Sequence, residues 1–334
     1  MKIKVSKYTF EFISSNQSYF IYNSQTNILI KINKDIYEII HKSKITSDSS
    51  LLLKFNDEII NKFKELKIIV DWDENEKYIL DLEMNYMIDS FANNRIVLVI
   101  APTTACNFGC DYCFEKNKKN IKMSNETIDN LIAFLKEFKF SDRLHLTWYG
   151  GEPLLATPII EKILKRIKSE LSHLKIEYQL LITNGYYLDQ KHISIFDDFP
   201  LNEVQVTLDG NKARHDKIRC LKHSGKETYD RILSNVDDYT TKYPDTLVSV
   251  RVNIDRKNSG SFNEQRVILN KRWEGKNVLI YPGILRIEDE KNNCMACEAM
   301  SHDDIREIYY DIGEEVDFYP KLKDKGCCAT HVNS

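Results

Sequence analysis

The chain has 334 residues, of which 47 are basic and 50 acidic, so its formal net charge is only −3. This length suits one large domain or two modest ones, and the balanced charge gives no general field that would attract nucleic acid or a membrane surface. No run approaches the roughly 20 apolar residues that a membrane-spanning helix needs, and the opening MKIKVSKYTFEF does not resemble a secretory signal. We therefore expect a cytoplasmic protein in a reducing compartment, where the clustered ones among its eight cysteines serve metal or redox chemistry.

Residues 1–92 are predicted to form a small α+β domain and a connector. Two β-prone runs at residues 19–22 and 28–32 are separated by the polar segment SQTN, which predicts a hairpin. Asn33 is a suitable N-cap for the amphipathic helix that follows, and a second helix and a short strand come next. A hairpin combined with two helices suggests a winged-helix-like module, and the helical pattern at residues 81–91 suggests a connector.

From residue 93 onward the hydrophobic pattern alternates between strands and helices, which is typical of a parallel sheet with right-handed crossovers. The strands are expected to centre near Val97, Leu146, Leu181, Val206, Val250 and Leu279. Helices are expected at residues 124–138, at 157–171 with Thr157 as N-cap, and at 228–239. Six such units predict an α/β fold, an open and partial (β/α)6 barrel over residues 93–285, with its chemistry at the carboxyl ends of the strands.

Three cysteines, Cys106, Cys110 and Cys113, follow the first of these strands at C-x3-C-x2-C spacing. Thiolates grouped on one loop suit a soft metal site. Zinc would need a fourth ligand, typically from a second pair of cysteines or histidines. A zinc knuckle, or a set of reduced thiols with no metal, is the alternative. An iron–sulfur cube, in contrast, can be held by three thiolates, which leaves one iron open for a small molecule.

With the aromatic Tyr112 directly before the third cysteine, this loop resembles the signature of the radical S-adenosylmethionine (SAM) superfamily. The resemblance implies that Cys106, Cys110 and Cys113 hold a [4Fe–4S] cluster whose open iron is chelated by the amine and carboxylate of SAM. It also implies reductive cleavage of SAM to methionine and a 5′-deoxyadenosyl radical, with Tyr112 packed beside the adenine.

Two further motifs follow strands in the order that this family has. Gly150-Gly151-Glu152-Pro153 resembles the segment that binds the SAM amino group, because paired glycines let the backbone approach a ligand closely. Thr183-Asn184-Gly185 resembles a segment beside SAM, so Thr183 and Asn184 are expected to contact the ligand. Taken without the cysteine loop, each motif is equally a tight turn at a strand end.

Three polar residues of the later strands complete the predicted site. Asp209, in Thr207-Leu208-Asp209-Gly210, is similar to the S-[IVL]-D-G motif of the same families and is a candidate general base, although Asp-Gly is also an ordinary turn pair. Arg219 could order its loop or grip the SAM carboxylate, and a solvated charge run over residues 215–219 is the alternative. Asn253 alternates with Arg251 on one face of a strand and belongs to the site only if that face is the barrel interior.

The last predicted segment, residues 286–334, holds Cys294-x-x-Cys297 and Cys327. A zinc site is one reading. The segment also resembles the start of the SPASM extension, which binds auxiliary [4Fe–4S] clusters, because Cys327 precedes the pair Asn333-Ser334 as in that family. The sequence stops there, so we expect an incomplete SPASM segment, with Cys294, Cys297 and Cys327 as candidate ligands of an auxiliary cluster.

The resemblance is strongest to SPASM-type maturases of ribosomally made peptides and to anaerobic sulfatase-maturating enzymes. It implies a radical enzyme that forms a thioether, a carbon–carbon crosslink or a related oxidation in a precursor peptide. The expected partners are that peptide, whose leader would add a strand to the sheet of residues 1–92, and a reductant such as flavodoxin or ferredoxin. The alternatives are formylglycine formation on a sulfatase, a scaffolding role for residues 1–92, and a truncated relative that binds SAM or peptide without turnover.

Overall fold

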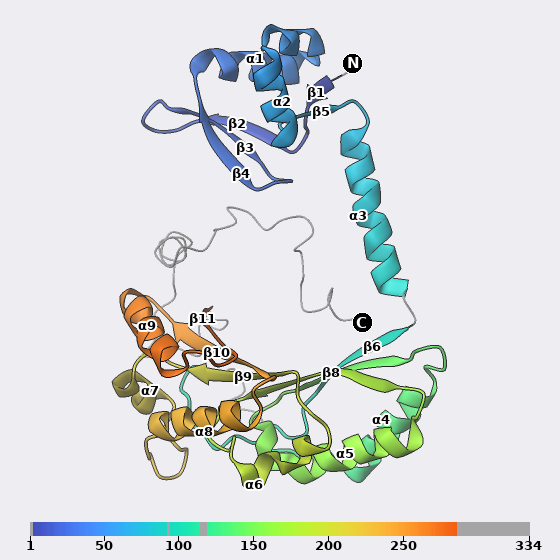
Figure 1. Ribbon diagram of the computed structural model, residues 1–334, viewed down its shortest axis with the longest axis vertical. Helices are drawn as coiled ribbons and strands as arrows, with labels where there is room; N and C mark the ends of the chain where they lie inside the picture. Colours follow the sequence, from blue (N-terminus) through green and yellow to red (C-terminus); the bar gives the residue numbers. More distant parts are fainter. Residues whose placement is uncertain (1–2, 92–93, 114–118, 286–334) are drawn as a thin grey trace. The chain divides into compact units, whose positions relative to one another are not determined.

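The computed structural model describes residues 3–91, 94–113 and 119–285. The chain divides between Ala92 and Asn93 into two compact units, and each unit has its own hydrophobic core (Figure 1). No helix within these described ranges is long and apolar enough to cross a membrane. Cys294, Cys297 and Cys327, which the sequence suggests as ligands of an auxiliary cluster, lie outside the described residues.

The first unit combines two small antiparallel sheets with three α-helices. One sheet has the order β2-β3-β4 and the other pairs β1 with β5. The elements are β1 (Ile3–Val5), β2 (Thr9–Ile13), β3 (Tyr19–Asn23), β4 (Ile28–Ile32), α1 (Lys34–Thr46), the 3-10 helix η1 (Ser49–Lys54), α2 (Asp57–Glu65), β5 (Ile69–Asp71) and α3 (Glu74–Phe91).

The predicted hairpin is confirmed by β3 and β4, and the predicted N-cap is confirmed by Asn33, whose side chain accepts a hydrogen bond from the N–H of Ile36. The connector helix begins at Glu74, seven residues before its predicted start at residue 81. Strands β1 and β2 were not predicted, because β1 has only three residues and gains its partner β5 from a distant part of the unit.

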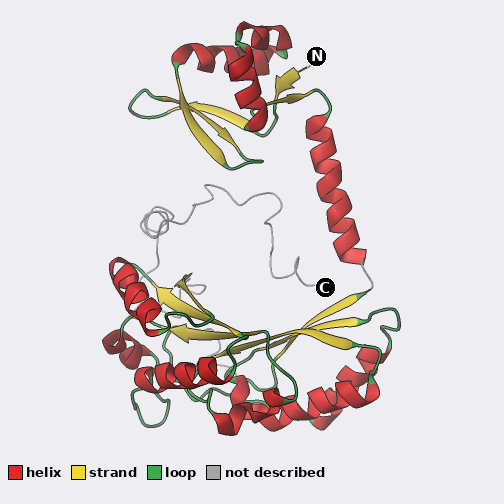
Figure 2. Cartoon of the chain, in the orientation of Figure 1, coloured by secondary structure: helices red, strands yellow, loops and turns green. Residues whose placement is uncertain are grey.

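The second unit is a six-stranded, all-parallel sheet in strict sequence order from β6 to β11. Figure 2 shows helices gathered against this sheet. The strands are β6 (Arg95–Ile100), β7 (Arg143–Trp148), β8 (Lys175–Thr183), β9 (Glu203–Leu208), β10 (Leu247–Ile254) and β11 (Val278–Ile284). The helices are α4 (Asn125–Lys136), α5 (Thr157–Glu170), α6 (Gln190–Ile193), α7 (Lys212–Ile218), α8 (Tyr229–Lys242) and α9 (Phe262–Arg272), with 3-10 turns η2 (Pro153–Ala156), η3 (Ser194–Asp197) and η4 (Ser259–Ser261).

All six predicted strands are therefore confirmed, and the sheet is an open, partial barrel whose edges are β6 and β11 within the described residues. The core between sheet and helices contains fully buried side chains of both layers, such as Trp148, Val206, Ile160 and Val236. The strands alternate between these residues and side chains on the opposite, concave face, which is the face available to a ligand.

One predicted helix start is wrong. Thr157 is the first residue of α5 and not its N-cap, because the 3-10 turn η2 runs directly into the helix and leaves Ala156 at the cap position. The hydroxyl of Thr157 instead donates to the carbonyl of Leu154 at 2.9 Å. The helices α6, α7 and α9 were not predicted.

Candidate functional site

Because the strands are parallel and follow one another in order, the segments after β6, β7, β8, β9 and β10 all emerge at one end of the sheet. This carboxyl-terminal end carries the cysteine loop after β6, the Gly-Gly-Glu turn after β7 and the Thr-Asn-Gly turn after β8. It also carries Asp209, directly after β9, and Asn253, the second-to-last residue of β10. The fold thus gathers the described residues that the sequence singles out.

The cysteine loop is held on both sides by backbone contacts. Thr103 forms an antiparallel bridge with Lys122, and Phe108 forms one with Leu221. The N–H of Gly109 also donates to the carbonyl of Cys220 at 3.1 Å. The loop that presents Cys106, Cys110 and Cys113 is therefore fixed to the segment that follows Arg219, although more than 100 residues separate the two in sequence.

The paired glycines approach the cysteine loop itself. The N–H of Gly151 donates to the carbonyl of Thr103 at 3.1 Å, and the N–H of Glu152 donates to that of Ala105 at 2.8 Å. A Cβ on Gly150, whose φ is +120°, would lie 2.4 Å from the carbonyl oxygen of Thr103, and a Cβ on Gly151 would lie 2.3 Å from that of Ala105. Only glycine fits at either position, so one reason for the pair is contact between two loops.

Glu152 connects this turn to the next one. Its Oε1 accepts hydrogen bonds from the Thr183 hydroxyl at 2.8 Å and from the N–H of Leu154 at 3.1 Å, and its Oε2 accepts from the N–H of Asn184 at 2.8 Å. The side chain has no exposed surface. Burial raises the pKa of this carboxyl, and the three donors partly oppose that rise. Glu152 thus braces two turns.

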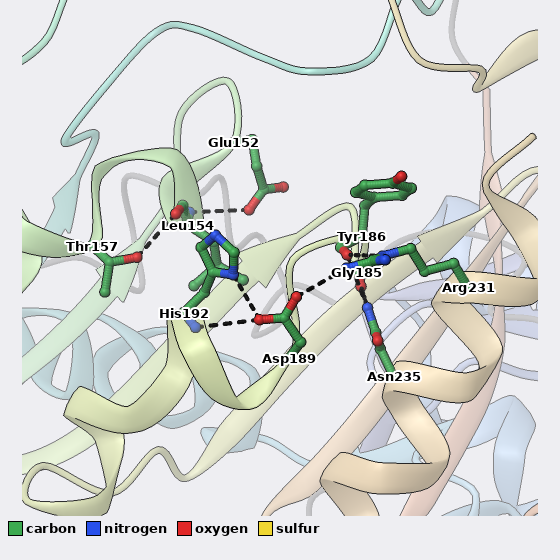
Figure 3. A network of polar contacts seen from close by, with 9 residues as sticks. All are labelled: Glu152, Leu154, Thr157, Gly185, Tyr186, Asp189, His192, Arg231 and Asn235. Carbon is green, nitrogen blue, oxygen red and sulfur yellow. Dashed lines mark hydrogen bonds and ion pairs between the residues drawn. The ribbon is translucent and has the colours of Figure 1, made fainter. Parts of the chain in front are cut away.

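The Thr-Asn-Gly turn lies against the first cysteine. The Asn184 amide donates to Asn107 Oδ1 at 2.8 Å and lies 3.9 Å from the sulfur of Cys106. Helix α8 supports this turn from behind, since the amide of Asn235 donates to the carbonyls of Gly185 and Tyr186, both at 2.9 Å (Figure 3). Arg231, one turn earlier on the helix, continues the network through the Tyr186 carbonyl and Asp189, which in turn bonds His192.

Tyr112 joins the cysteine loop to the later strands. Its hydroxyl donates to Asp209 Oδ2 at 2.6 Å and accepts from Arg219 Nη1 at 2.8 Å and from the Asn253 amide at 3.1 Å. Burial is the main cause that raises the pKa of Tyr112, so the phenol keeps its proton. The guanidinium of Arg219 also lies over the ring of Phe108, 5.5 Å from its centroid. One phenol thus links three predicted site residues.

Several buried polar atoms in this cluster have no hydrogen-bond partner among the residues that the structure describes. They are Asp209 Oδ1, Asn253 Oδ1, Arg219 Nε and Asn107 Nδ2. Asp209 is 1% exposed and Asn253 5% exposed, so water does not reach them freely. Leaving such atoms unpaired is costly, and the great majority of buried polar groups in proteins are paired. A polar ligand that offers both donors and acceptors fits this end of the sheet.

The three thiols are partly buried neighbours. Burial raises the pKa of Cys106, and it raises the pKa of Cys110 to about 12, while Arg219 opposes the rise at both thiols. Cys106 and Cys110 are therefore protonated at neutral pH unless a metal binds them. Within the described ranges, no three Cys, His, Asp or Glu side chains surround a single-ion position. A cube differs, because each thiolate binds its own iron, and three neighbouring sulfurs on one loop fit that donor set.

The alternative of a solvated charge run at residues 215–219 is wrong at its two ends. His215 has no exposed surface and Arg219 is 8% exposed. His215 lies on α7, which the sequence analysis did not predict, and its ring contacts the backbone of Asp209. Thr228 and Asn107 are further members of the site that the sequence did not single out. A His and an Arg four residues apart, on one face of a short helix, were the available signal.

Comparison with known proteins agrees with this geometry. Residues 100–258 match the model of the radical SAM superfamily. The radical SAM cyclopropyl synthase TigE of Paramaledivibacter caminithermalis is 22% identical over 321 residues, which span 80% of this chain and 66% of the relative. The serine-type anaerobic sulfatase-maturating enzyme of Bacteroides thetaiotaomicron is 24% identical over 156 residues, or 44% of this chain and 37% of the relative.

A solved structure described as native anSMEcpe with bound AdoMet and Cp18Cys peptide has the same fold. It is 21% identical, with a TM-score of 0.53, and the match covers 66% of this chain and 59% of that one. The matched parts thus span less than two thirds of each of these relatives. The described site and these similarities lead to one conclusion: the chain contains a radical SAM domain, at residues 100–258.

Proposed function

We propose that this chain binds a [4Fe–4S] cluster and SAM at the carboxyl-terminal end of its six-stranded sheet and cleaves SAM reductively. The observation that carries the proposal is the convergence of three thiols with buried, unpartnered atoms of Asp209, Asn253 and Arg219. Proteins with the radical SAM fold bind both groups. When bound, the reduced cluster supplies an electron to SAM, and cleavage of its sulfonium bond gives methionine and a 5′-deoxyadenosyl radical.

The chain's own residues would hold and orient these groups. Cys106, Cys110 and Cys113 are the proposed cluster ligands, and Tyr112 would bring an apolar ring to the adenine. Gly150 and Gly151 would contribute through their main chain, because the Glu152 carboxylate is buried and already bonded. Thr183 and Asn184 are proposed to line the ligand's other side, and the Asn184 amide already lies near Cys106.

Three further side chains would complete the ligand's polar contacts. Asp209 Oδ1 and Asn253 Oδ1 can accept hydrogen bonds from ribose hydroxyls or an amine, and Arg219 Nε can donate to a carboxylate. Asp209 is also the proposed proton acceptor, because one of its oxygens is free while the other is held by Tyr112. Burial of the whole cluster would exclude water from the reacting centre.

We further propose that the substrate is a ribosomally made peptide, in which the enzyme forms a thioether, a carbon–carbon crosslink or a related oxidation. The alignment with the cyclopropyl synthase TigE, which extends over 80% of this chain, supports a radical enzyme, and the Cp18Cys peptide bound in the anSMEcpe structure supports a peptide substrate. In the sheet β2-β3-β4, the edge at β2 is partly occupied, because Thr9 N–H donates to Ser6 and its carbonyl accepts from Lys44. The β4 edge is the proposed position where a leader peptide adds as a strand.

The division of the chain at residues 92/93 suggests separate tasks: leader binding for residues 1–92 and radical chemistry for the barrel of residues 93–285. We also propose flavodoxin or ferredoxin as the reductant, and an auxiliary [4Fe–4S] cluster with Cys294, Cys297 and Cys327 among its ligands. The proposed reductant and the proposed auxiliary cluster both follow from the resemblance to SPASM-type enzymes.

The test is anaerobic reconstitution with iron and sulfide, followed by reduction with dithionite in the presence of SAM. The proposal predicts formation of 5′-deoxyadenosine and methionine in equal amounts. A reconstituted chain that holds iron but leaves SAM intact would remove the catalytic part of the proposal. For the peptide, the precursor encoded beside the gene is added to the full chain and to a chain lacking residues 1–92. The proposal predicts that only the full chain binds it, whereas both cleave SAM.

A further inference from the structure

His215 and Thr228 form a hydrogen-bonded chain between the backbones of two site residues. The Asp209 N–H donates to His215 Nδ1 at 3.2 Å, and His215 Nε2 lies 3.1 Å from the Thr228 hydroxyl oxygen. The Thr228 hydroxyl donates to the carbonyl of Arg219 at 2.7 Å. These donors fix the state of the ring: Nδ1 must accept, so the proton is on Nε2 and points to Thr228.

The side chains of the same two residues close this chain into a ring of contacts. Arg219 Nη1 donates to the Tyr112 hydroxyl, which donates to Asp209 Oδ2. The direct approach of Arg219 Nη1 to Asp209 Oδ2 is 4.0 Å, which is longer than a hydrogen bond. Asp209 and Arg219 are therefore anchored twice, by their backbones through His215 and Thr228 and by their side chains through Tyr112.

This separation is unusual for an arginine beside a carboxylate. Such pairs favour two parallel hydrogen bonds, and closing the pair here would use Asp209 Oδ1 and Arg219 Nε, the two atoms that now lack partners. Both residues are nearly fully buried, so water does not compensate them. The Tyr112 hydroxyl lies between the two side chains, and the contacts that join their backbones are those of His215 and Thr228.

We propose that His215 and Thr228 are positioning residues, which keep Asp209 and Arg219 apart so that Asp209 Oδ1 and Arg219 Nε stay available to the bound SAM. This inference rests on the proposed function for the identity of the ligand, but its geometric part concerns the protein alone. Loss of the Thr228 hydroxyl leaves His215 Nε2–H without its acceptor and the Arg219 carbonyl without its donor, so the ring is no longer held where Nδ1 accepts from Asp209. The Asp209 backbone is then released, and the pair can close.

The test compares Thr228→Val with Thr246→Val and Thr228→Ser. Thr246 is a matched control, because its buried hydroxyl also donates to a backbone carbonyl, that of Leu201 at 3.0 Å, just before β10 begins. The affinity for SAM is measured by equilibrium dialysis with the reconstituted full chain. We expect Thr228→Val to weaken SAM binding by about tenfold, the loss of roughly one buried hydrogen bond to a charged group, with Thr228→Ser close to wild type and Thr246→Val unchanged.

A second readout needs neither cluster nor SAM. Amide hydrogen exchange of the unreconstituted chain, followed by mass spectrometry of peptides that contain Asp209 and Arg219, reports the released backbone directly. Thr228→Val should exchange about tenfold faster there, and Thr246→Val should not, if one protecting bond is lost. If wild-type protein binds no SAM, the proposed function fails, and exchange alone decides whether the positioning holds.

The inference is overturned if Thr228→Val matches wild type in both readouts, or if Thr246→Val changes SAM binding to the same extent. The melting temperature separates a positioning role from a general loss of stability. Thr228→Val should lower the melting temperature no more than Thr246→Val does, because the hydrogen bonds of a closed Asp209–Arg219 pair compensate for the lost Thr228 contacts. If Thr228→Val does not fold, His215→Asn replaces it, since the shorter side chain cannot bridge Asp209 and Thr228, and the same two readouts apply.

Discussion

Glu203 and Asp209, which lie near opposite ends of the six-stranded sheet, differ in whether their buried oxygens have partners. At the amino-terminal end, Glu203 accepts hydrogen bonds from the hydroxyls of Tyr178 and Ser249, both at 2.6 Å. The hydroxyl of Tyr281 likewise donates to Gln205 at 2.8 Å. None of these side chains buries a polar atom that lacks a partner, whereas Asp209, Asn253 and Arg219 at the carboxyl-terminal end each do.

Strand β9 carries one carboxylate at each end, Glu203 where it begins and Asp209 just after it ends. The difference between them distinguishes polar side chains that stabilise the sheet from polar side chains that are available to a ligand. A polar group whose hydrogen-bond partners all lie in the protein stabilises the fold, whereas a buried polar group that lacks a hydrogen-bond partner lowers the stability. Such a cost persists where it serves a ligand.

The largest expected effect comes from the cysteine loop. Cys110→Ala should abolish the visible absorption of the reconstituted cluster and all formation of 5′-deoxyadenosine, because the cube loses one of its three protein thiolates. Cys220→Ala is the matched control, since Cys220 is also a partly buried free cysteine and its backbone borders the same loop. Iron loading that survives Cys110→Ala, or disappears with Cys220→Ala, would break the proposed assignment.

The carboxylates of Glu203 and Asp209, at the two ends of β9, provide a matched pair of substitutions. Asp209→Asn should lower the rate of SAM cleavage by at least about tenfold, because it replaces an open charged acceptor with a neutral amide. Glu203→Gln should leave that rate unchanged and lower only the stability. The measurement is the initial rate of 5′-deoxyadenosine formation beside a urea unfolding curve for each variant. Equal losses of rate in both variants would erase the distinction between the two ends.

His215 makes the carboxyl-terminal end sensitive to acid. Burial lowers the pKa of this ring to about 3, from about 6.5 in an unfolded chain, with Arg219 as a further cause. Between these values the unfolded chain binds a proton that the folded chain does not, so stability falls as the pH falls below 6.5.

From this single group we expect a loss of about 2 kcal/mol in the free energy of unfolding between pH 7 and pH 5. His215→Asn should be less stable at pH 7 but should lack this part of the pH dependence. Urea unfolding at the two pH values measures both effects. Parallel pH profiles for the two proteins would show that the ring is not held neutral.

The smallest expected effect lies at the amino-terminal end. Tyr178→Phe removes one hydrogen bond to Glu203, which keeps its bond from Ser249. We expect a loss of about 1 kcal/mol in the free energy of unfolding and no change in SAM affinity. A change in SAM affinity would mean that this end of the sheet also serves the ligand.

Much of the barrel was predictable because its signals are local. The six apolar runs that predict the strands can be recognised from neighbouring residues, and all six strands are confirmed. The N-cap at Thr157 was wrong because a 3-10 turn and a helix have nearly the same local pattern. The charged residues of 215–219 left a solvated charge run open as an alternative, and α7 (Lys212–Ile218) was not predicted because it has only seven residues.

The site could be predicted only in part, for a related reason. Single motifs indicate which residues gather at the strand ends, but they do not show which polar atoms lack a hydrogen-bond partner in the folded chain. The hydrogen bonds of Glu152 to Thr183, Asn184 and Leu154, for example, join two loops and could not be seen in its motif. The unpartnered atoms of Asp209 and Asn253, and the ring that passes through His215 and Thr228, depend on contacts between segments far apart in the chain.

The central claim is that three thiols on one loop hold an iron–sulfur cube with one iron left for SAM. Electron paramagnetic resonance of the anaerobically reconstituted, dithionite-reduced chain, recorded with and without SAM, tests it most directly. The account predicts the signal of a reduced [4Fe–4S] cluster whose g values shift when SAM is added. A chain that takes up no iron, or that binds zinc through Cys106, Cys110 and Cys113 instead, would contradict it.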